Sequence, residues 1–231
     1  MRVVFVHGAC VRDGAWWWHR TGDLLLERGT ASVAPLLPSC GETGLAPGFT
    51  GPGLLEDVAA VRRHLLDSDE PTVVVGHSYG GIVAAEAIAG VAAVQHLLLI
   101  SSYLPEVGES LSTFGGEAPA PFLEVDPDGG TFGVRADDLV ATFLQDCPDT
   151  GPEALTRLAR QSLQVTGQPV GAPAWHDLPT TYLVCADDLG TPADRQREFA
   201  RRARTVIELA AGHHPFLSQP QAVRDVVLSL G

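Results

Sequence analysis

Short runs of consecutive apolar residues recur along the chain and alternate with helix-like segments. Most runs are continuous, as expected for strands buried on both faces of a sheet. They predict strands at Arg2–Val6, Ser32–Leu36, Thr72–Val75, His96–Ile100, Thr180–Cys185 and Thr205–Leu209. The segments between them predict helices at Trp16–Glu27, Pro52–Leu66, Gly80–Ile88, Pro192–Arg202 and Gln219–Leu230. This alternation predicts one α/β domain, residues 1–231, with a mostly parallel six-stranded sheet flanked by helices.

One long segment departs from the alternation. Residues 104–178 lie between the fourth and fifth predicted strands and are rich in Pro, Gly and Asp. Helical patterns cover Ala136–Leu144 and Pro152–Leu163. Because a long insertion in a compact domain is usually functional, we predict a small helical cap here. The alternative is a segment that only covers a sheet edge.

The stretch Gly76-His77-Ser78-Tyr79-Gly80 fits the pattern G-x-S-x-G. A predicted buried strand precedes it and a predicted helix follows, which is the context in which this pattern presents a nucleophilic serine at a tight turn. The glycines remove side chains that would collide where the strand and the helix meet. Ser78 is therefore the predicted nucleophile, at the sheet edge where open α/β sheets bind ligands. The alternative is a structural serine in a turn.

A serine becomes an effective nucleophile only when a base takes its proton, so the chain must supply a histidine and an acid that orients it. His213 follows a glycine in the loop before the last helix and is the predicted base. His214 is the alternative, but it precedes a proline, which favours an extended backbone. Asp187 and Asp188 follow the fifth predicted strand; either can orient the imidazole, and we favour Asp188. The fourth predicted strand ends in Ser101-Ser102 and offers no competing carboxylate.

Acyl transfer also needs two backbone donors for the negative oxygen that forms during the reaction. One is expected from the N–H of Tyr79, directly after the nucleophile. The other is expected from the N–H of Ala9, in the loop after the first strand. His7 in that loop is expected to hold it by hydrogen bonds rather than to act as a second base.

Composition excludes several classes of function. The chain has 231 residues, of which 45 % are hydrophobic and 19 % charged, and its net charge is −13. Such an acidic chain lacks the basic patches that nucleic acids and anionic membranes require. The N-terminal stretch reads as a strand rather than a signal peptide, and no window approaches the roughly 18 apolar residues of a membrane span. The four scattered cysteines indicate reduced thiols in a cytoplasmic protein, and no metal or cofactor is implied.

Several segments resemble those of a known family. FVHGACVRDGAWWWHR, VVVGHSYGG, SSYLPEVGESL, YLVCADDLGTP and AGHHPFLSQP resemble, in order, segments of small α/β-hydrolases of the plant methylesterase and hydroxynitrile lyase type and their bacterial relatives. The resemblance covers nearly the whole chain. It implies an α/β-hydrolase fold with a compact helical cap, a Ser78–His213–Asp188 triad, and the Ala9 and Tyr79 donors.

The family's activities include ester hydrolysis and, in one branch, cyanohydrin cleavage. That lyase branch carries a lysine beside the catalytic histidine, whereas His214 and Pro215 follow it here. Two departures affect the expected pocket rim and leave the substrate open. Relatives often have an Asp-Leu-Pro-Gly turn where this chain has Leu36–Gly41, and the first loop carries an additional charged pair, Arg12-Asp13.

Aromatic residues of the insertion are the candidates for a substrate pocket over Ser78. They are Phe114, Phe122, Phe143 and Trp175. The alternative is that some of them only pack the cap onto the core, as Trp16–Trp18 are expected to do for the first helix. We expect a serine hydrolase that cleaves an ester, a lactone or a thioester of a small apolar molecule, as a monomer or homodimer. The alternatives are a lyase or cyclase of small-molecule biosynthesis on the same scaffold, and a non-catalytic binding protein with a relic triad.

Overall fold

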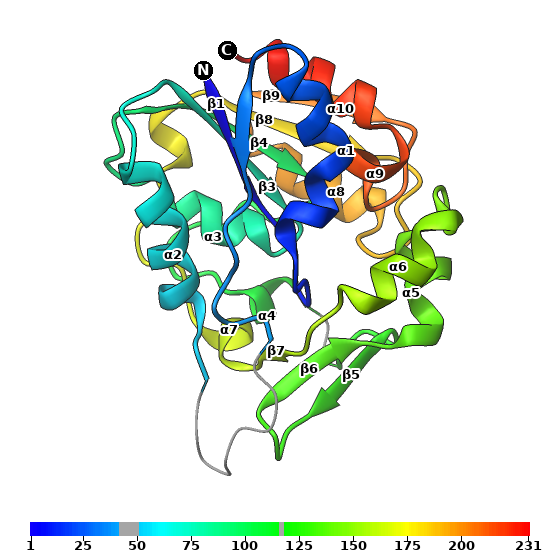
Figure 1. The fold of residues 1–231 in the computed structure, drawn as a ribbon. Coiled ribbons are helices and arrows are strands. Elements are labelled where there is room, and N and C mark those ends of the chain that lie inside the picture. Colours follow the sequence, from blue (N-terminus) through cyan, green and yellow to red (C-terminus); the bar gives the residue numbers. More distant parts are fainter. Residues whose placement is uncertain (42–50, 116–117) are drawn as a thin grey trace.

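The six predicted strands form one parallel sheet in the order β2-β1-β3-β4-β8-β9 (Figure 1). The structure is a computed structural model that describes residues 1–41, 51–115 and 118–231. The strands are β1 Arg2–Val6, β2 Ala31–Val33, β3 Thr72–His77, β4 Val94–Ile100, β8 Thr180–Cys185 and β9 Thr205–Leu209. Each neighbouring pair is parallel, so the carboxyl ends of all strands lie at the same edge of the sheet.

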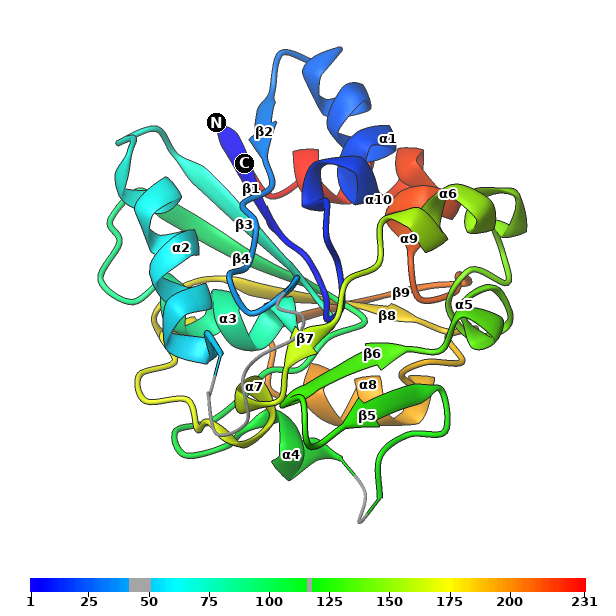
Figure 2. The ribbon, with the colours of Figure 1, turned by 60° about the horizontal axis from the view of Figure 1, so that its bottom comes forward.

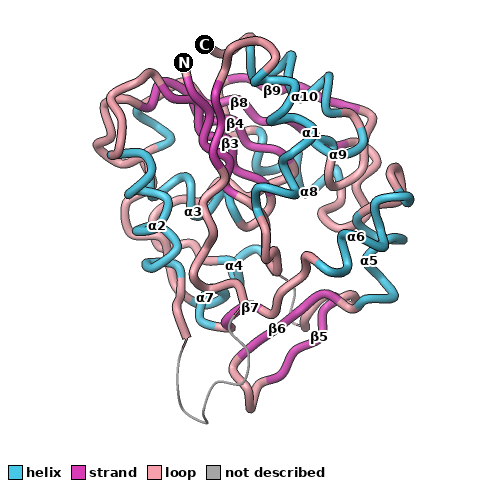
Figure 3. The backbone as a smooth tube through the Cα atoms, in the orientation of Figure 1, coloured by secondary structure: helices cyan, strands magenta, loops and turns pink. Residues whose placement is uncertain are grey.

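Helices cover both faces of this sheet (Figure 3). One face carries α1 Gly14–Leu26, α9 Pro215–Ser218 and α10 Pro220–Leu228, and the other carries α2 Leu54–Leu66, α3 Gly80–Ala87 and α8 Ala193–Ala200. Side chains of successive strand residues point to opposite faces. Val3 and Phe5 of β1 pack with the first set of helices, whereas Val4 and Val6 pack with the second. Burial on both sides explains why β1, β3, β4 and β8 read as continuous apolar runs.

Strand β2 differs from its prediction. It ends at Val33 instead of continuing to Leu36. Pro35 has no N–H to contribute to a ladder, so pairing stops there. The N–H of Leu37 instead donates to His7 Nε2 at 3.3 Å, which directs this segment toward the loop after β1.

The predicted cap lies between β4 and β8 and contains strands as well as helices. Its helices are α4 Leu111–Phe114, α5 Ala136–Phe143, α6 Gly151–Thr156 and α7 Gln164–Gly167, with 3₁₀ turns at Pro148–Thr150 and Trp175–Asp177. Its strands are β5 Leu123–Asp126, β6 Thr131–Val134 and β7 Gln161–Ser162, which form an antiparallel sheet. Figure 2 shows this sheet lying across the carboxyl edge of the main sheet. Residues 116 and 117, within the predicted cap, lie outside the described residues.

The predicted helix Pro152–Leu163 is wrong beyond Thr156. The carbonyl of Arg157 accepts the N–H of Arg12 at 2.9 Å, and the N–H of Ala159 donates to the carbonyl of Cys10 at 2.9 Å. Backbone groups must find partners somewhere, and here the loop after β1 supplies them in place of a helical turn. The cap is therefore bonded directly to the loop that carries Ala9.

No helix in the described part of the chain is both long enough and apolar enough to cross a membrane.

Candidate active site

Ser78 lies at the turn between β3 and α3. Its φ of +50° is in the left-handed region that L-residues rarely adopt. Such strain is typical of functional positions. A side chain at Gly80 would collide with the carbonyl oxygen of Val6, so the glycine allows α3 to begin directly above β1. This close approach places Ser78 on the wall of the main cavity.

His213 comes from the loop before α9 and reaches the acid that follows β8. Its Nδ1–H donates to Asp188 Oδ2 at 2.8 Å, and both residues are buried. Because Nδ1 makes this bond, Nε2 is the ring nitrogen of His213 that is left for another partner. His213 lines the same cavity as Ser78. The alternative acid, Asp187, uses its backbone N–H to bond the carbonyl of Ala211 at 3.0 Å, and it is Asp188 whose carboxylate meets the imidazole.

The carboxylate of Asp188 accepts hydrogen bonds from several further groups. Oδ1 accepts the N–H of Gly190 at 2.7 Å and that of Thr191 at 3.0 Å. Oδ2 accepts the Gln196 amide at 3.0 Å and the Ser101 hydroxyl. Burial opposes the charged form, but His213 and these donors outweigh it, so the pKa of Asp188 lies below its ordinary value. Asp188 is thus held as a carboxylate.

Sequence reasoning missed Ser101 and Gln196. Ser101 was noted only because it is not a carboxylate, yet its Oγ also lies 3.2 Å from His213 Nδ1. Its position could have revealed it. Ser101 directly follows β4, and the carboxyl end of β4 must lie beside that of the neighbouring strand β8. Gln196 lies inside α8, where a buried glutamine has no local signature.

The loop after β1 is held by His7, as its sequence position suggested. The Nδ1–H of His7 donates to the carbonyl of Gly8 at 2.9 Å, and its Nε2 accepts the N–H of Leu37. Burial lowers the pKa of His7 to about 4, so the ring is neutral and able to accept. Ala9 and Tyr79 both line the cavity near Ser78. Within the described ranges, neither of their N–H groups has an acceptor in the protein.

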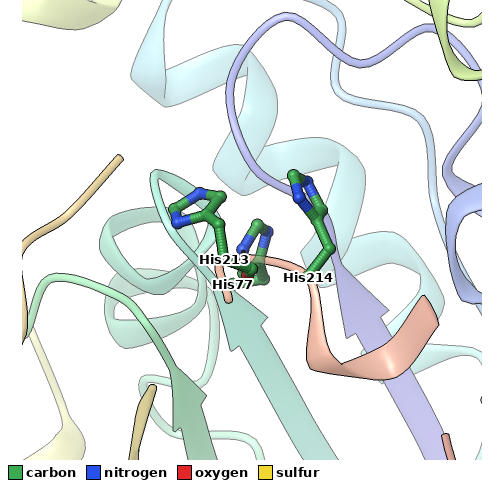
Figure 4. A group of neighbouring side chains, drawn as sticks. All are labelled: His77, His213 and His214. Carbon is green, nitrogen blue, oxygen red and sulfur yellow. Dashed lines mark hydrogen bonds between the residues drawn. The ribbon is translucent and has the colours of Figure 1, made fainter. Parts of the chain in front are cut away.

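Three buried histidines, His77, His213 and His214, lie together at the cavity, with their ring centroids 4.5, 4.9 and 4.9 Å apart (Figure 4). His77 Nε2–H donates to the carbonyl of His213 at 2.9 Å, and His214 Nδ1–H donates to the carbonyl of Phe143 at 3.0 Å. Burial lowers the pKa of His214 to about 3 and holds that of His77 well below its ordinary value. His214, the alternative base, therefore faces a carbonyl and not an acid.

The same three histidines are the group that could hold a metal ion among the residues searched. An ion there would bind the ring nitrogen of His213 that its bond to Asp188 leaves free. That nitrogen is the one a base would use. We therefore assign the cluster to the imidazole bonded to Asp188 and its packing.

The cavity over Ser78 has a volume of about 530 Å³ and lies between the cap and the sheet edge. Phe122 and Phe143, two of the predicted pocket residues, line it. The ring of Phe143 lies edge-on to His213, with centroids 5.0 Å apart. Most lining side chains are apolar, and the described lining residues include no Asp, Glu, Lys or Arg. The site therefore combines a strained serine, an imidazole bonded to a buried carboxylate, and an apolar chamber.

The sequence pattern of the alpha/beta hydrolase family matches residues 3–226. The chain belongs to this family. It is 31 % identical to an alpha/beta hydrolase, nvfD, of Aspergillus novofumigatus, over 83 % of this chain and 82 % of that protein. Its identity to methylesterase 1 of Arabidopsis thaliana is 26 %, covering 98 % and 94 %. The family match and the similarity to methylesterases together place the chain among the esterase-type α/β-hydrolases, as the resemblance implied.

Solved structures show the same fold. A pyrethroid hydrolase from Sphingobium faniae JZ-2 superposes with a TM-score of 0.82 at 24 % identity, covering 99 % of this chain and 96 % of that one. Polyneuridine aldehyde esterase superposes with a TM-score of 0.78 at 21 % identity, covering 99 % and 98 %.

In this α/β-hydrolase, two predicted pocket residues do not line the cavity. Phe114 stacks on Tyr103, with centroids 5.4 Å apart, and so lies behind a residue that does line it. The indole N–H of Trp175 donates to the carbonyl of Pro105 at 2.7 Å, within the buried core. Conversely, Trp17, expected only to fix the first helix, lines the cavity and packs on His214. The sequence identifies the aromatic residues, but tertiary packing decides which of them face the cavity.

Proposed function

We propose that this α/β-hydrolase is a serine hydrolase that cleaves a carboxylic ester, lactone or thioester of a neutral, apolar small molecule. Ser78 is the nucleophile, His213 the base, and Asp188 the acid that orients the imidazole. The N–H groups of Ala9 and Tyr79 are the oxyanion donors. The observation that carries this proposal is the 2.8 Å bond from His213 to Asp188 beside a cavity that also exposes a strained Ser78.

The chemistry follows from the proton positions. Ser78 Oγ attacks the carbonyl carbon while its proton passes to His213 Nε2. The resulting oxyanion accepts hydrogen bonds from the two backbone donors. His213 then gives the proton to the leaving alcohol or thiol, and the acyl group stays on Ser78. Water gives a proton to His213 as it attacks the acyl-enzyme. His213 then returns this proton to Ser78 Oγ as the acyl–oxygen bond breaks, which releases the acid and restores the enzyme.

The cavity supports a neutral substrate. Moving a carboxylate or phosphate from water into an apolar chamber costs several kcal/mol unless a cation meets it. The described lining residues offer none. The volume of about 530 Å³ is in the range that holds small organic ligands. The relatives named methylesterases support an ester as the reacting group.

A fluorophosphonate probe tests the nucleophile. We expect the wild-type protein to be labelled and to hydrolyse p-nitrophenyl esters, and Ser78→Ala to lose both properties while keeping its melting temperature. Folded wild-type protein that takes no label would favour a binding protein with a relic triad. Labelled protein that hydrolyses none of an ester series of increasing chain length would favour the lyase or cyclase alternative.

A further inference from the structure

A buried carboxylate outside the triad, Asp57 on α2, has no basic partner among the described residues. It is 0 % exposed. Its oxygens accept three hydrogen bonds: from the N–H of Ser39 at 2.9 Å, from the hydroxyl of Ser39 at 2.6 Å and from the hydroxyl of Tyr79 at 2.7 Å. Burying an acid without a cation is costly, so this group requires an explanation.

The bonds of Asp57 lead to both segments that carry the proposed oxyanion donors. The first is direct, because Tyr79 supplies one donor from its own backbone. The second passes through the cap: the amide N–H of Gln161 donates to Ser39 Oγ at 2.9 Å, and Gln161 Oε1 accepts the N–H of Cys10 at 3.0 Å. Cys10 directly follows Ala9, which supplies the other donor.

When Asp57 is ionised, its charge sets the direction of every hydrogen bond in this series. An ionised carboxylate only accepts, so the hydroxyls of Tyr79 and Ser39 must both donate to it. The oxygen of Ser39 is then free to accept from Gln161. This fixes the Gln161 amide with its nitrogen toward Ser39 and its oxygen toward Cys10. An asparagine at 57 would present N–H groups of its own and remove this order.

We propose that Asp57 is a positioning residue that holds the two oxyanion donors in register, Tyr79 directly and Ala9 through Ser39, Gln161 and Cys10. The inference rests on the proposed function, because it assigns a role to Asp57 only if Ala9 and Tyr79 stabilise an oxyanion. Asp57 itself does not line the cavity. It therefore acts on the geometry of the donors and not on the substrate.

The test compares Asp57→Asn with wild type on a p-nitrophenyl ester. Removing one donor outright lowers the rate by roughly 100- to 1000-fold. Loosening both should lower kcat by about 10- to 100-fold, with KM within about threefold, since the effect belongs to the transition state. Tyr79→Phe removes only the direct bond and should lower kcat by about tenfold. If Asp57→Asn does not fold, the kcat of Tyr79→Phe tests the proposal by itself.

A second readout separates positioning from stability. A trifluoromethyl ketone forms a tetrahedral adduct with Ser78 that needs both donors, so its inhibition constant should rise in step with the loss in kcat/KM. The affinity for a matched unreactive amide should not change. Thr72→Val is the matched control: it removes the two part-buried hydrogen bonds that the buried Thr72 hydroxyl makes with the Arg2 side chain and the Glu70 carbonyl, at the opposite edge of the sheet. It should lower the melting temperature and leave kcat unchanged.

The outcomes distinguish this inference from the proposed function. If wild type is active and Ser78→Ala is not, but Asp57→Asn and Tyr79→Phe keep kcat within twofold, the role of Asp57 is wrong and the hydrolase stands. If wild type has no esterase activity, or Ser78→Ala retains it, both proposals are overturned.

Discussion

At the scale of single residues, the site is ordered by which atoms donate and which accept. His7, His77, His213 and His214 are buried, and each directs one ring N–H to an oxygen of the protein. Only that of His213 meets a carboxylate, so the neighbouring rings remain supports while His213 has the partner that stabilises an imidazolium. Asp188 accepts five hydrogen bonds in total, which holds its position as well as its charge.

Ser101→Ala tests that support. The change removes one donor from Asp188 Oδ2, so the carboxylate is less stabilised and its pKa should rise toward its ordinary value. We expect kcat to fall by about tenfold, because hydrogen bonds to charged groups are among the stronger ones. Steady-state kinetics measure the effect. Ser229→Ala, which removes an exposed hydroxyl bonded to the carbonyl of Val226, is the control. An unchanged kcat in Ser101→Ala would contradict the role.

Asp57 should also be visible in the pH dependence of stability. Burial raises its pKa from 3.8 to about 6, so between these two pH values the folded protein holds a proton that the unfolded chain has already lost. Its contribution to the free energy of unfolding therefore falls as pH rises from 4 to 7, by on the order of 3 kcal/mol. Urea unfolding at several pH values, for wild type and Asp57→Asn, isolates this term. The free energy of unfolding of wild type, relative to that of Asp57→Asn, should fall as pH rises. A difference that does not change with pH would refute the raised pKa of Asp57.

At the scale of elements, the turn between β3 and α3 decides what the serine can do. The helix begins so close to β1 that position 80 has no room for a side chain. The sequence predicted this turn well, because glycines at fixed spacing between a buried strand and a helix have few other uses. The cap was predicted less well. Its strand β7 forms only because Gln161 and Ser162 meet partners that are distant in sequence.

Gly80→Ala tests the close approach. The new methyl group must displace backbone atoms of β1, which carry the loop with Ala9, so we expect the melting temperature to fall by several degrees and kcat by at least tenfold. Gly167→Ala in α7 is the control, since nothing lies within 4 Å of its added methyl group. It should be neutral or slightly stabilising. Equal behaviour of the two variants, by thermal unfolding and by esterase rate, would disprove the packing argument.

At the scale of the whole molecule, the cap and the sheet edge enclose the chamber together. The loop after β1 is bonded to the cap through Cys10 and Arg12, so one side of the chamber is continuous with the proposed oxyanion loop. The molecule carries a net charge of −13, yet the described lining of its cavity carries no carboxylate. Within the described residues, the carboxylates thus lie away from the cavity lining.

A matched pair of substrates tests this separation. The 4-nitrophenyl methyl diester of adipic acid and the corresponding monoacid differ only at the far end, which is a neutral methyl ester in the first and a carboxylate in the second. Because the chamber provides no cation, we expect kcat/KM to be about 100-fold higher for the neutral diester. The rate of spontaneous hydrolysis and the Ser78→Ala protein give the background. Equal values for the two substrates would contradict a neutral binding site.

The order of strands and helices, the turn at Ser78 and the choice of His213 follow from local pattern. Apolar runs, glycine spacing and the effect of a proline on the residue before it are local. They can therefore be recognised in the sequence alone. The sequence favoured Asp188 over Asp187, and the tertiary structure shows that it is Asp188 that bonds the imidazole. Only the tertiary structure brought in Ser101, Gln196 and Asp57, turned Phe114 and Trp175 away from the cavity and turned Trp17 toward it. These outcomes depend on which distant side chains meet, since a buried polar atom takes whichever partner the fold brings within reach.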